Sequence, residues 1–394
     1  MKKIFLPVVF FTIIHHLSGQ TLKLVDHTIH LKNKPSFNLK IPEGYNISIA
    51  MEGLNRPRFF AISPDGRLFI TDLYNRTDNK KGRILILENW DEKKKCFNQI
   101  TTYLDNLHNP NQVAFYNSNA EEYLYVAETE KLSYYRYQAG DNKPSSVAKV
   151  IATFPDYGLD YKYGGWHLTR SLAFHANKLY VSVGSSCNAC VEKENVRATI
   201  IEMNPDGTYQ RIYAKGLRNA VGIKWINNQL WVTNMGRDLI GLDKPEDLFH
   251  SVDENGYYGW PFYYQYKKQI YTDSQFKDSA HGSYVKKPIT APWGFNAHSA
   301  PLGFEYFSNF TDSKLNNTFL VALHGSTSVW RQRGNAIVQM MPDGNYREII
   351  AGFLQGKIES KRFGRPCDII KWNDHSFFIS DDKSGVVYYV WKEN

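Results

Sequence analysis

The sequence has little that would place the chain in a membrane or on nucleic acid. Beyond the first 19 residues, no apolar segment reaches the roughly 20 residues that a membrane-spanning helix needs. The formal net charge is +8, but the basic residues are dispersed and form no run of about five or six. These absences argue against a membrane-spanning protein and against a nucleic-acid partner. The arginines are better suited to a small anionic ligand.

Cysteine is scarce, with four residues in the chain: Cys96, Cys187, Cys190 and Cys367. The motif Cys187-Asn-Ala-Cys190 has no second CxxC or HxxxH pair that would complete four zinc ligands. In an exported chain it therefore favours a tight disulfide over a zinc site.

The N-terminus has the pattern of an export signal. It begins MKKIFLPVVFFTIIHHLSG, with two lysines, an apolar run of about ten residues and then small residues. We predict that residues 1–19 are a signal peptide, and that residues 20–394 form a single domain that is secreted or periplasmic. Removal of the two lysines would leave a formal charge of 8 − 2 = +6.

The sequence also has no long stretch with apolar residues at i, i+3, i+4 and i+7, so we expect helices to be few and short. What recurs is a pair of strands with a turn between them, in six copies at a spacing of roughly 50–60 residues, one interval being stretched by an insertion near 240–300. Such radial repetition predicts an all-β fold, a six-bladed β-propeller of four-stranded antiparallel blades, with five to seven blades as the range. The six copies are FFAISPDGRLFITD (59–72), 112–129, 170–185, 221–236, 302–325 and 367–382.

Polar residues precede the first strand of several repeats. In a propeller these first strands converge on the axis, so the loops that enter them line one funnel. We therefore expect one site built from His167, Arg218 and Asn219, Arg365, His298, and the early-blade residues Asn109, Asn111 and Gln112.

These residue types suit an anionic ligand and proton transfer. Converging guanidinium groups match carboxylates or phosphates, and a neutral His167 can accept a proton from a hydroxyl. The loop NMGRD (234–238) contains Gly236 and Arg237, whose main-chain oxygens are suitable ligands for calcium. Arg170 points along its strand, and we leave it outside the site.

Several motifs, taken in order, resemble the soluble quinoprotein sugar dehydrogenases. The nearest branch is the sorbosone dehydrogenase-like part of the glucose/sorbosone dehydrogenase family, and the resemblance runs from about residue 45 to the end. The motifs that carry it are GGWHLTRSLAF, LYVSVGSSCNAC, GLRNAVGI, LWVTNMGRD, GYYGWPF, HSAPLGFEY, GRPCDII and ISDDKSGVVYYV.

The resemblance implies an enzyme that oxidises a sugar, or a related aldose or polyol, with pyrroloquinoline quinone (PQQ) and Ca²⁺. It implies that His167 takes the proton of the substrate hydroxyl while hydride passes to the quinone. It implies that Arg218, Asn219 and Arg365 contact the cofactor and that Gly236 and Arg237 bind calcium through main-chain oxygens. No CxxCH haem motif is present, so the electrons would leave to an external acceptor.

The chain departs from the glucose-oxidising branch at several positions. Ser185 stands where that branch has the acid that orients the base, with Asp160 as a possible substitute. His324 is the nearest candidate for a lysine that faces the quinone, and His298 is a further candidate contact. Cys367 stands in place of a second arginine, and HGSTSVWR in place of HGSWNR.

Two other classes of protein remain open at this stage. A secreted propeller can bind a ligand without catalysis, because a fold does not fix a function. A calcium-dependent lactonase is the weaker alternative, because that metal needs several side-chain carboxylates, whereas the positions before the inner strands carry arginine, asparagine and histidine. The sequence carries no signal for an oligomeric state.

Overall fold

The structure, a computed structural model, describes residues 22–156, 167–277 and 287–393. The predicted signal peptide lies outside these residues. Within them, no helix is long and apolar enough to cross a membrane, and the helices are three short 3₁₀ turns, as the missing periodicity predicts.

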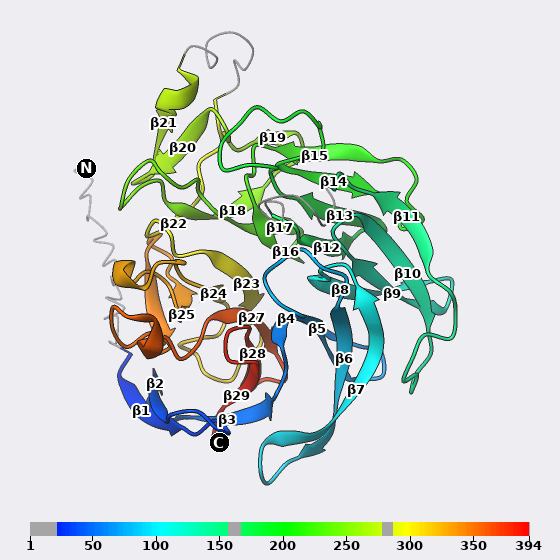
Figure 1. Ribbon diagram of the computed structural model, residues 1–394, viewed down its shortest axis with the longest axis vertical. Coiled ribbons are helices and arrows are strands. Elements are labelled where there is room, and N and C mark those ends of the chain that lie inside the picture. The colour runs from blue at the N-terminus through cyan, green and yellow to red at the C-terminus, as the bar shows by residue number, and fades with distance from the viewer. Residues whose placement is uncertain (1–21, 157–166, 278–286, 394) are drawn as a thin grey trace, which may run out of the picture.

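Six sheets stand in a ring around one axis, and each has four antiparallel strands (Figure 1). One of them has a fifth strand, Gly256–Tyr257, which pairs parallel with Arg211–Lys215. The prediction of a six-bladed β-propeller is confirmed. In chain order the blades are β4–β7 (Arg56–Ile62, Leu68–Leu73, Gly82–Asp91, Cys96–Leu107), β8–β11 (Gln112–Ser118, Glu121–Ala127, Lys131–Tyr137, Lys149–Thr153), β12–β15 (Arg170–His175, Lys178–Val183, Thr199–Met203, Arg211–Lys215), β16–β18 with β22 (Ala220–Ile226, Gln229–Asn234, Asp247–Val252, Trp293–Phe295), β23–β26 (Pro301–Tyr306, Phe319–Leu323, Ala336–Met340, Tyr346–Ile350), and β27–β29 with β3 (Pro366–Lys371, Ser376–Asp381, Val386–Lys392, Tyr45–Glu52).

The first strand of each blade lies nearest the axis. These strands are β4, β8, β12, β16, β23 and β27, and each contacts the next around a closed ring (Figure 1). Each predicted strand pair is the inner hairpin of one blade. The Asp-Gly turns place Gly66 at φ +82° and Gly344 at φ +85°, a left-handed conformation that glycine adopts without strain.

The ring is closed by strands from both ends of the chain. β3 pairs antiparallel with β29, with Tyr45 opposite Lys392. The tyrosine hydroxyl and the Lys392 ammonium both reach the carboxylate of Asp312 in the neighbouring blade, at 2.9 and 3.2 Å. The N-terminal strand β3 thus completes the blade that the C-terminal strands β27–β29 begin.

Two hairpins lie outside the blades. β1 (Leu24–Ile29) and β2 (Phe37–Pro42) form one of them, which is bonded to the chain after β26 through Lys40 and Ala351. The predicted insertion lies between β18 and β22. It contains β19 (Gly256–Tyr257), the hairpin of β20 (Tyr263–Tyr266) and β21 (Gln269–Thr272), and η1 (Ser274–Phe276).

Apolar side chains fill the spaces between blades and also close the axis. At the axis, Phe59, Val221, Leu302 and Cys367 from four inner strands form one buried cluster. Cys367 is fully buried there, and burial raises the pKa of its thiol. The residue that replaces the expected arginine is therefore part of the axial core.

Candidate active site

A cavity of about 220 Å³ opens where the inner strands begin and the second strands end. These two points coincide because neighbouring strands of a blade are antiparallel. Six of the residues predicted for the site line this cavity although they are far apart in sequence: Arg218, Gly236, Arg237, His298, His324 and Arg365.

Arg365 is a lining residue with an unmet hydrogen-bonding need. It is only 3% exposed, its Nε donates to the carbonyl of His324 at 3.0 Å, and its Nη2 donates to that of Gly325 at 2.5 Å. Its Nη1 is buried and has no hydrogen-bond partner among the described residues. Burial, with a contribution from nearby guanidinium groups including that of Arg76, lowers the pKa of Arg365 to about 9. A buried, unsatisfied guanidinium donor in a cavity wall favours an anionic ligand.

Arg218 is held by main-chain and side-chain oxygens. Its Nε donates to the carbonyl of Asn188 at 2.9 Å, its Nη2 to Oδ1 of Asn188 at 3.1 Å, and its Nη1 to the carbonyl of Gly236 at 3.0 Å. Burial lowers the pKa of Arg218 to about 10. The guanidinium is thus fixed in one orientation at the edge of the cavity.

The loop that contains Gly236 and Arg237 is pinned from both sides. The Gly236 amide donates to Asp247 at 2.8 Å, and burial raises the pKa of this carboxyl to about 6. The Arg237 side chain is directed to Asp273 of the insertion at 3.0 Å. Since the Gly236 carbonyl already accepts from Arg218, a cation bound to that oxygen would lie beside the guanidinium.

His167 has the hydrogen-bonding arrangement of a neutral base. Its Nδ1 lies 2.9 Å from the Ser185 carbonyl and 3.0 Å from the Ser185 hydroxyl, which itself donates to the carbonyl of Cys187 at 2.7 Å. Both contacts therefore place the proton on Nδ1 and the lone pair on Nε2. Burial, followed by the charge of Arg218, holds the pKa of His167 well below its ordinary value. The main chain and hydroxyl of Ser185 occupy the place expected for an acid, and Asp160 lies outside the described residues.

His167 and Asn219 stand beside Arg218, outside the lining of the cavity. Gly184 makes this packing possible, because a Cβ there would lie 2.5 Å from the His167 Cβ and 2.8 Å from Oδ1 of Asn219. Nδ2 of Asn219 lies 3.4 Å from the sulfur of Met235. Arg170, which we left outside the site, lies under this histidine and donates to its carbonyl at 2.7 Å.

The two candidate histidines of the cavity are both engaged. His298 lies 3.0 Å from Asp238 through Nδ1 and 3.1 Å from the Gly241 carbonyl through Nε2, and the bond to Asp238 raises its pKa. His324 donates from Nε2 to Asp382 at 2.7 Å, while burial lowers its pKa to about 3. His324 is therefore neutral and does not replace a lysine charge.

The early-blade residues do not line the cavity, in contrast to our expectation. Asn111 accepts from Arg58 at 3.1 Å and donates to Ser171 at 2.9 Å, and Gln112 accepts from the Leu172 amide at 3.3 Å. Nδ2 of Asn109 faces the carbonyl of Thr77 at 3.4 Å. These side chains tie adjacent inner strands and loops together, because a polar group at the start of a strand can face the neighbouring blade as well as the axis.

Sequence reasoning found Gly236, Arg237 and His324, which follow the second strand of a blade. It missed two residues at the same point of other blades, Arg76 and Asp382. Arg76 follows β5 and lines the cavity. Asp382 follows β28, and its carboxylate accepts from Nε2 of His324. The same carboxylate forms ion pairs with Arg56 at 2.8 Å and with Arg58 at 3.1 Å. Their position after a second strand could have predicted them, because in each blade the end of the second strand lies next to the start of the first strand, at the face where the cavity opens.

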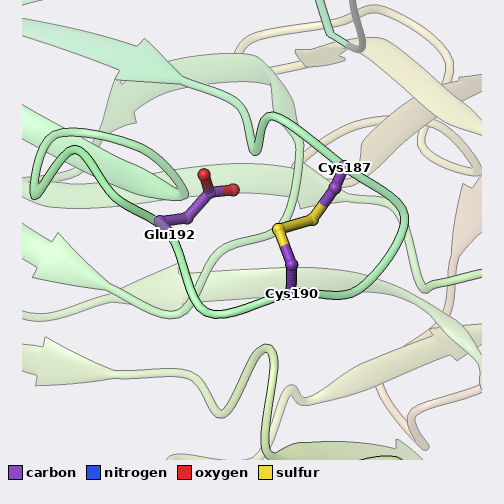
Figure 2. A group of neighbouring side chains, drawn as sticks. All are labelled: Cys187, Cys190 and Glu192. Atoms are coloured by element: carbon purple, nitrogen blue, oxygen red, sulfur yellow. A yellow bond between two sulfur atoms is a disulfide. The ribbon is translucent and has the colours of Figure 1, made fainter.

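The CxxC motif forms a disulfide. Cys187 and Cys190 are bonded to each other, while the neighbouring Glu192 accepts from the amide and the hydroxyl of Ser186 at 2.7 and 2.6 Å (Figure 2). The disulfide prediction is confirmed, and the zinc alternative is wrong because each sulfur is bonded to the other.

Comparison with known proteins places this geometry in a family. The TrAA12-like family matches residues 39–251, which is more than half of the chain. The chain belongs to the TrAA12-like family. It is 26% identical over 386 residues to an uncharacterized protein of Borreliella burgdorferi, covering 90% of this chain and 91% of that one.

Solved structures share the fold of this TrAA12-like chain. The holo form of the pyranose dehydrogenase PQQ domain from Coprinopsis cinerea has a TM-score of 0.71 at 16% identity, covering 91% of this chain and 98% of its own. A calcium structure of the Trichoderma reesei carbohydrate-active enzyme of family AA12 has a TM-score of 0.71 at 17% identity, covering 90% and 96%. The fold expected from the resemblance to soluble quinoprotein sugar dehydrogenases is confirmed, and the family of the chain is the TrAA12-like one.

Proposed function

We propose that this protein is a quinoprotein dehydrogenase that oxidises a sugar, or a related aldose or polyol, with PQQ and passes the electrons to an external acceptor. The observation that carries the proposal is the buried, unpartnered Nη1 of Arg365 in the wall of the cavity. Family membership, and the shared fold of the Coprinopsis PQQ domain in its holo form, support the choice of ligand.

The charge of the cavity suits this cofactor. PQQ carries three carboxylates, and five arginines line the cavity against two carboxyl groups, those of Asp238 and Asp247. When bound, PQQ supplies a quinone that accepts hydride from the substrate. We assign Arg365 and Arg218 to its carboxylates, with Arg76 as an additional cation, and His298 and His324 to the surrounding wall. Asn219, beside Arg218 and outside this lining, is proposed as a further cofactor contact.

His167 is the proposed catalytic base. Its low pKa keeps the imidazole neutral at neutral pH, and the bond from Nδ1 to Ser185 leaves Nε2 as the acceptor for a hydroxyl proton. Arg218 helps to keep the imidazole neutral because its charge disfavours a second cation. The neighbouring disulfide-bonded loop holds the serine that orients this ring.

Calcium is the proposed metal, with the main-chain oxygens of Gly236 and Arg237 as ligands. It would act as a Lewis acid toward the cofactor when bound. A cation at the Gly236 carbonyl would lie beside the Arg218 guanidinium, and an anionic cofactor would offset the repulsion between the two positive charges, so we expect metal and cofactor to bind cooperatively. The calcium structure of the Trichoderma enzyme, which shares this fold, supports the choice of metal.

Export is proposed from the N-terminal leader and is consistent with the disulfide, since such bonds persist in oxidising compartments. The mature protein would then act outside the cytoplasm, secreted or periplasmic, and meet its sugar substrate and electron acceptor there.

The direct test is calorimetric titration of the purified protein with PQQ, with and without Ca²⁺, followed by a sugar panel with a dye acceptor. We expect saturable PQQ binding that calcium strengthens and dye reduction that depends on a sugar. An absence of PQQ binding in the presence of calcium would contradict the proposal and favour a propeller that binds another anion.

A further inference from the structure

The loop Cys187–Cys190, with the sequence CNAC, lies outside the lining of the cavity, yet it contacts several parts of the proposed site. It follows β13 and is closed on itself by the disulfide (Figure 2). The proposed chemistry gives it one role, that of holding the Ser185 hydroxyl through the Cys187 carbonyl.

Asn188 is the centre of these contacts. Its carbonyl accepts from Nε of Arg218 at 2.9 Å, and its Oδ1 accepts from Nη2 of the same arginine at 3.1 Å. Oδ1 also accepts from the amide of Asp238 at 2.8 Å, and Nδ2 donates to the carbonyl of Asp238 at 3.0 Å. One residue therefore fixes both the cofactor-facing guanidinium and the end of the proposed calcium loop.

The rest of the loop reaches the base and the insertion. The Cys187 carbonyl accepts from the Ser185 hydroxyl, which contacts Nδ1 of His167. The Ala189 carbonyl accepts from Gln275 at 3.2 Å, and the same glutamine side chain accepts from Arg237 at 2.7 Å. The loop thus links groups from three separate parts of the chain.

We infer that the disulfide-closed CNAC loop is a positioning element, in which Asn188 sets the guanidinium of Arg218 and the calcium loop relative to the base His167. This inference rests on the proposed function. Its physical basis is geometric, because a carbonyl and an amide side chain on one short, cross-linked loop present fixed acceptors to the planar fork of an arginine. The disulfide reduces the number of conformations in which those acceptors would be misplaced.

The chain offers variants that separate positioning from mere stability. Asn188→Ala removes the three side-chain hydrogen bonds. Asn188→Asp keeps oxygen acceptors for Arg218 and for the Asp238 amide but adds a negative charge next to the guanidinium. Asn195→Ala is the matched control, since Asn195 is an exposed asparagine in the same connection between β13 and β14.

The experiment measures amide exchange of residues 234–240 in the full-length protein without cofactor, and PQQ affinity by calorimetry with Ca²⁺. For Asn188→Ala we expect faster exchange of the Asp238 amide and a Kd for PQQ that rises roughly ten- to hundredfold, because hydrogen bonds to a charged group are lost. Asn188→Asp should restore protection of the amide but still weaken PQQ binding, since the new carboxylate competes for Arg218. Asn195→Ala should match the wild type in both measurements.

The serine double variant Cys187→Ser/Cys190→Ser tests the role of the cross-link itself, and we expect it to show the same two changes as Asn188→Ala. Wild-type exchange and wild-type affinity in Asn188→Ala would overturn the inference. A parallel loss of amide protection over the whole chain in Asn188→Ala would also overturn it, because such a loss would indicate general destabilisation. If the wild-type protein binds no PQQ, the proposed function fails, whereas the exchange measurement still tests positioning of the loop by Asn188.

Discussion

Arg365 combines burial, positive charge and an unpartnered donor, and these properties determine what its replacement should do. We expect Arg365→Gln to raise the Kd for PQQ roughly ten- to hundredfold, because a charge-assisted hydrogen bond to a carboxylate is lost. The rate at saturating cofactor should change much less. Calorimetry would measure the affinity, with Arg136→Ala as the control, since Arg136 pairs with Glu121 at the surface. An unchanged affinity would remove Arg365 from the cofactor site.

His167 gives the corresponding prediction for catalysis. His167→Ala should lower turnover by about two to four orders of magnitude while PQQ affinity stays close to that of the wild type. Because the pKa of His167 is lowered, the base is unprotonated above its ordinary value of 6.5, and activity should fall only at more acidic pH.

The pH profile also tests the contribution of Arg218. Arg218 lowers the pKa of His167, so Arg218→Ala should move the acid limb of the profile to higher pH. Turnover measured across pH with saturating cofactor locates the acid limb in the wild type and in Arg218→Ala. His30→Ala, at an exposed histidine, is the surface control. Turnover in His167→Ala within a few-fold of the wild type would assign the base to another residue.

At the scale of elements, the loop that presents Arg76 is anchored by a buried ion-pair cluster. Nε2 of His108 contacts Asp78 in that loop, and Nδ1 contacts Glu130 at 2.5 Å. Burial opposes the charged imidazole, but the hydrogen bonds to Glu130 and Asp78 prevail and raise the pKa of His108. The arrangement therefore holds the β5–β6 loop through a protonated histidine.

This cluster makes stability depend on pH in a defined direction. A raised pKa in the folded state means that the stabilisation is fully present below the unfolded pKa and is lost as pH rises through the folded value. We expect His108→Gln to lower the free energy of unfolding more at pH 6 than at pH 9. Urea denaturation at the two pH values measures this difference, and an equal effect at both would contradict a charged His108.

The elements themselves were predictable, whereas several side-chain directions were not. The six strand pairs follow from alternation and from the turn residues between the strands, such as Asp65-Gly66, both of which are local properties. Asn111 was expected to face the funnel, but it binds Arg58 and Ser171 of the adjacent blades. That choice depends on neighbouring strands that the local sequence does not contain.

At the scale of the whole molecule, the propeller depends on a small apolar cluster at its axis. Leu302 is 2% exposed and packs with Phe59, Val221 and Cys367 from three other inner strands. Leu302→Ala should lower the free energy of unfolding by about 2–5 kcal/mol, because it leaves a cavity where four blades meet. Chemical denaturation measures the loss.

The control is Leu242→Ala, at a leucine that is 59% exposed, for which we expect a change within about 0.5 kcal/mol. A loss for Leu302→Ala no larger than that of the control would show that the axial cluster does not stabilise the ring.

The sequence by itself determined the repeat, the number of blades, the disulfide and six of the residues that line the cavity. It could do so because alternation, turn chemistry and cysteine spacing act over a few residues, and because repetition multiplies a local signal. Only the tertiary structure decided that His324 is a neutral partner of Asp382, that Cys367 belongs to the axial core, and that Asn188 holds Arg218. Those outcomes depend on burial and on partners from distant blades, which exist only once the ring has closed.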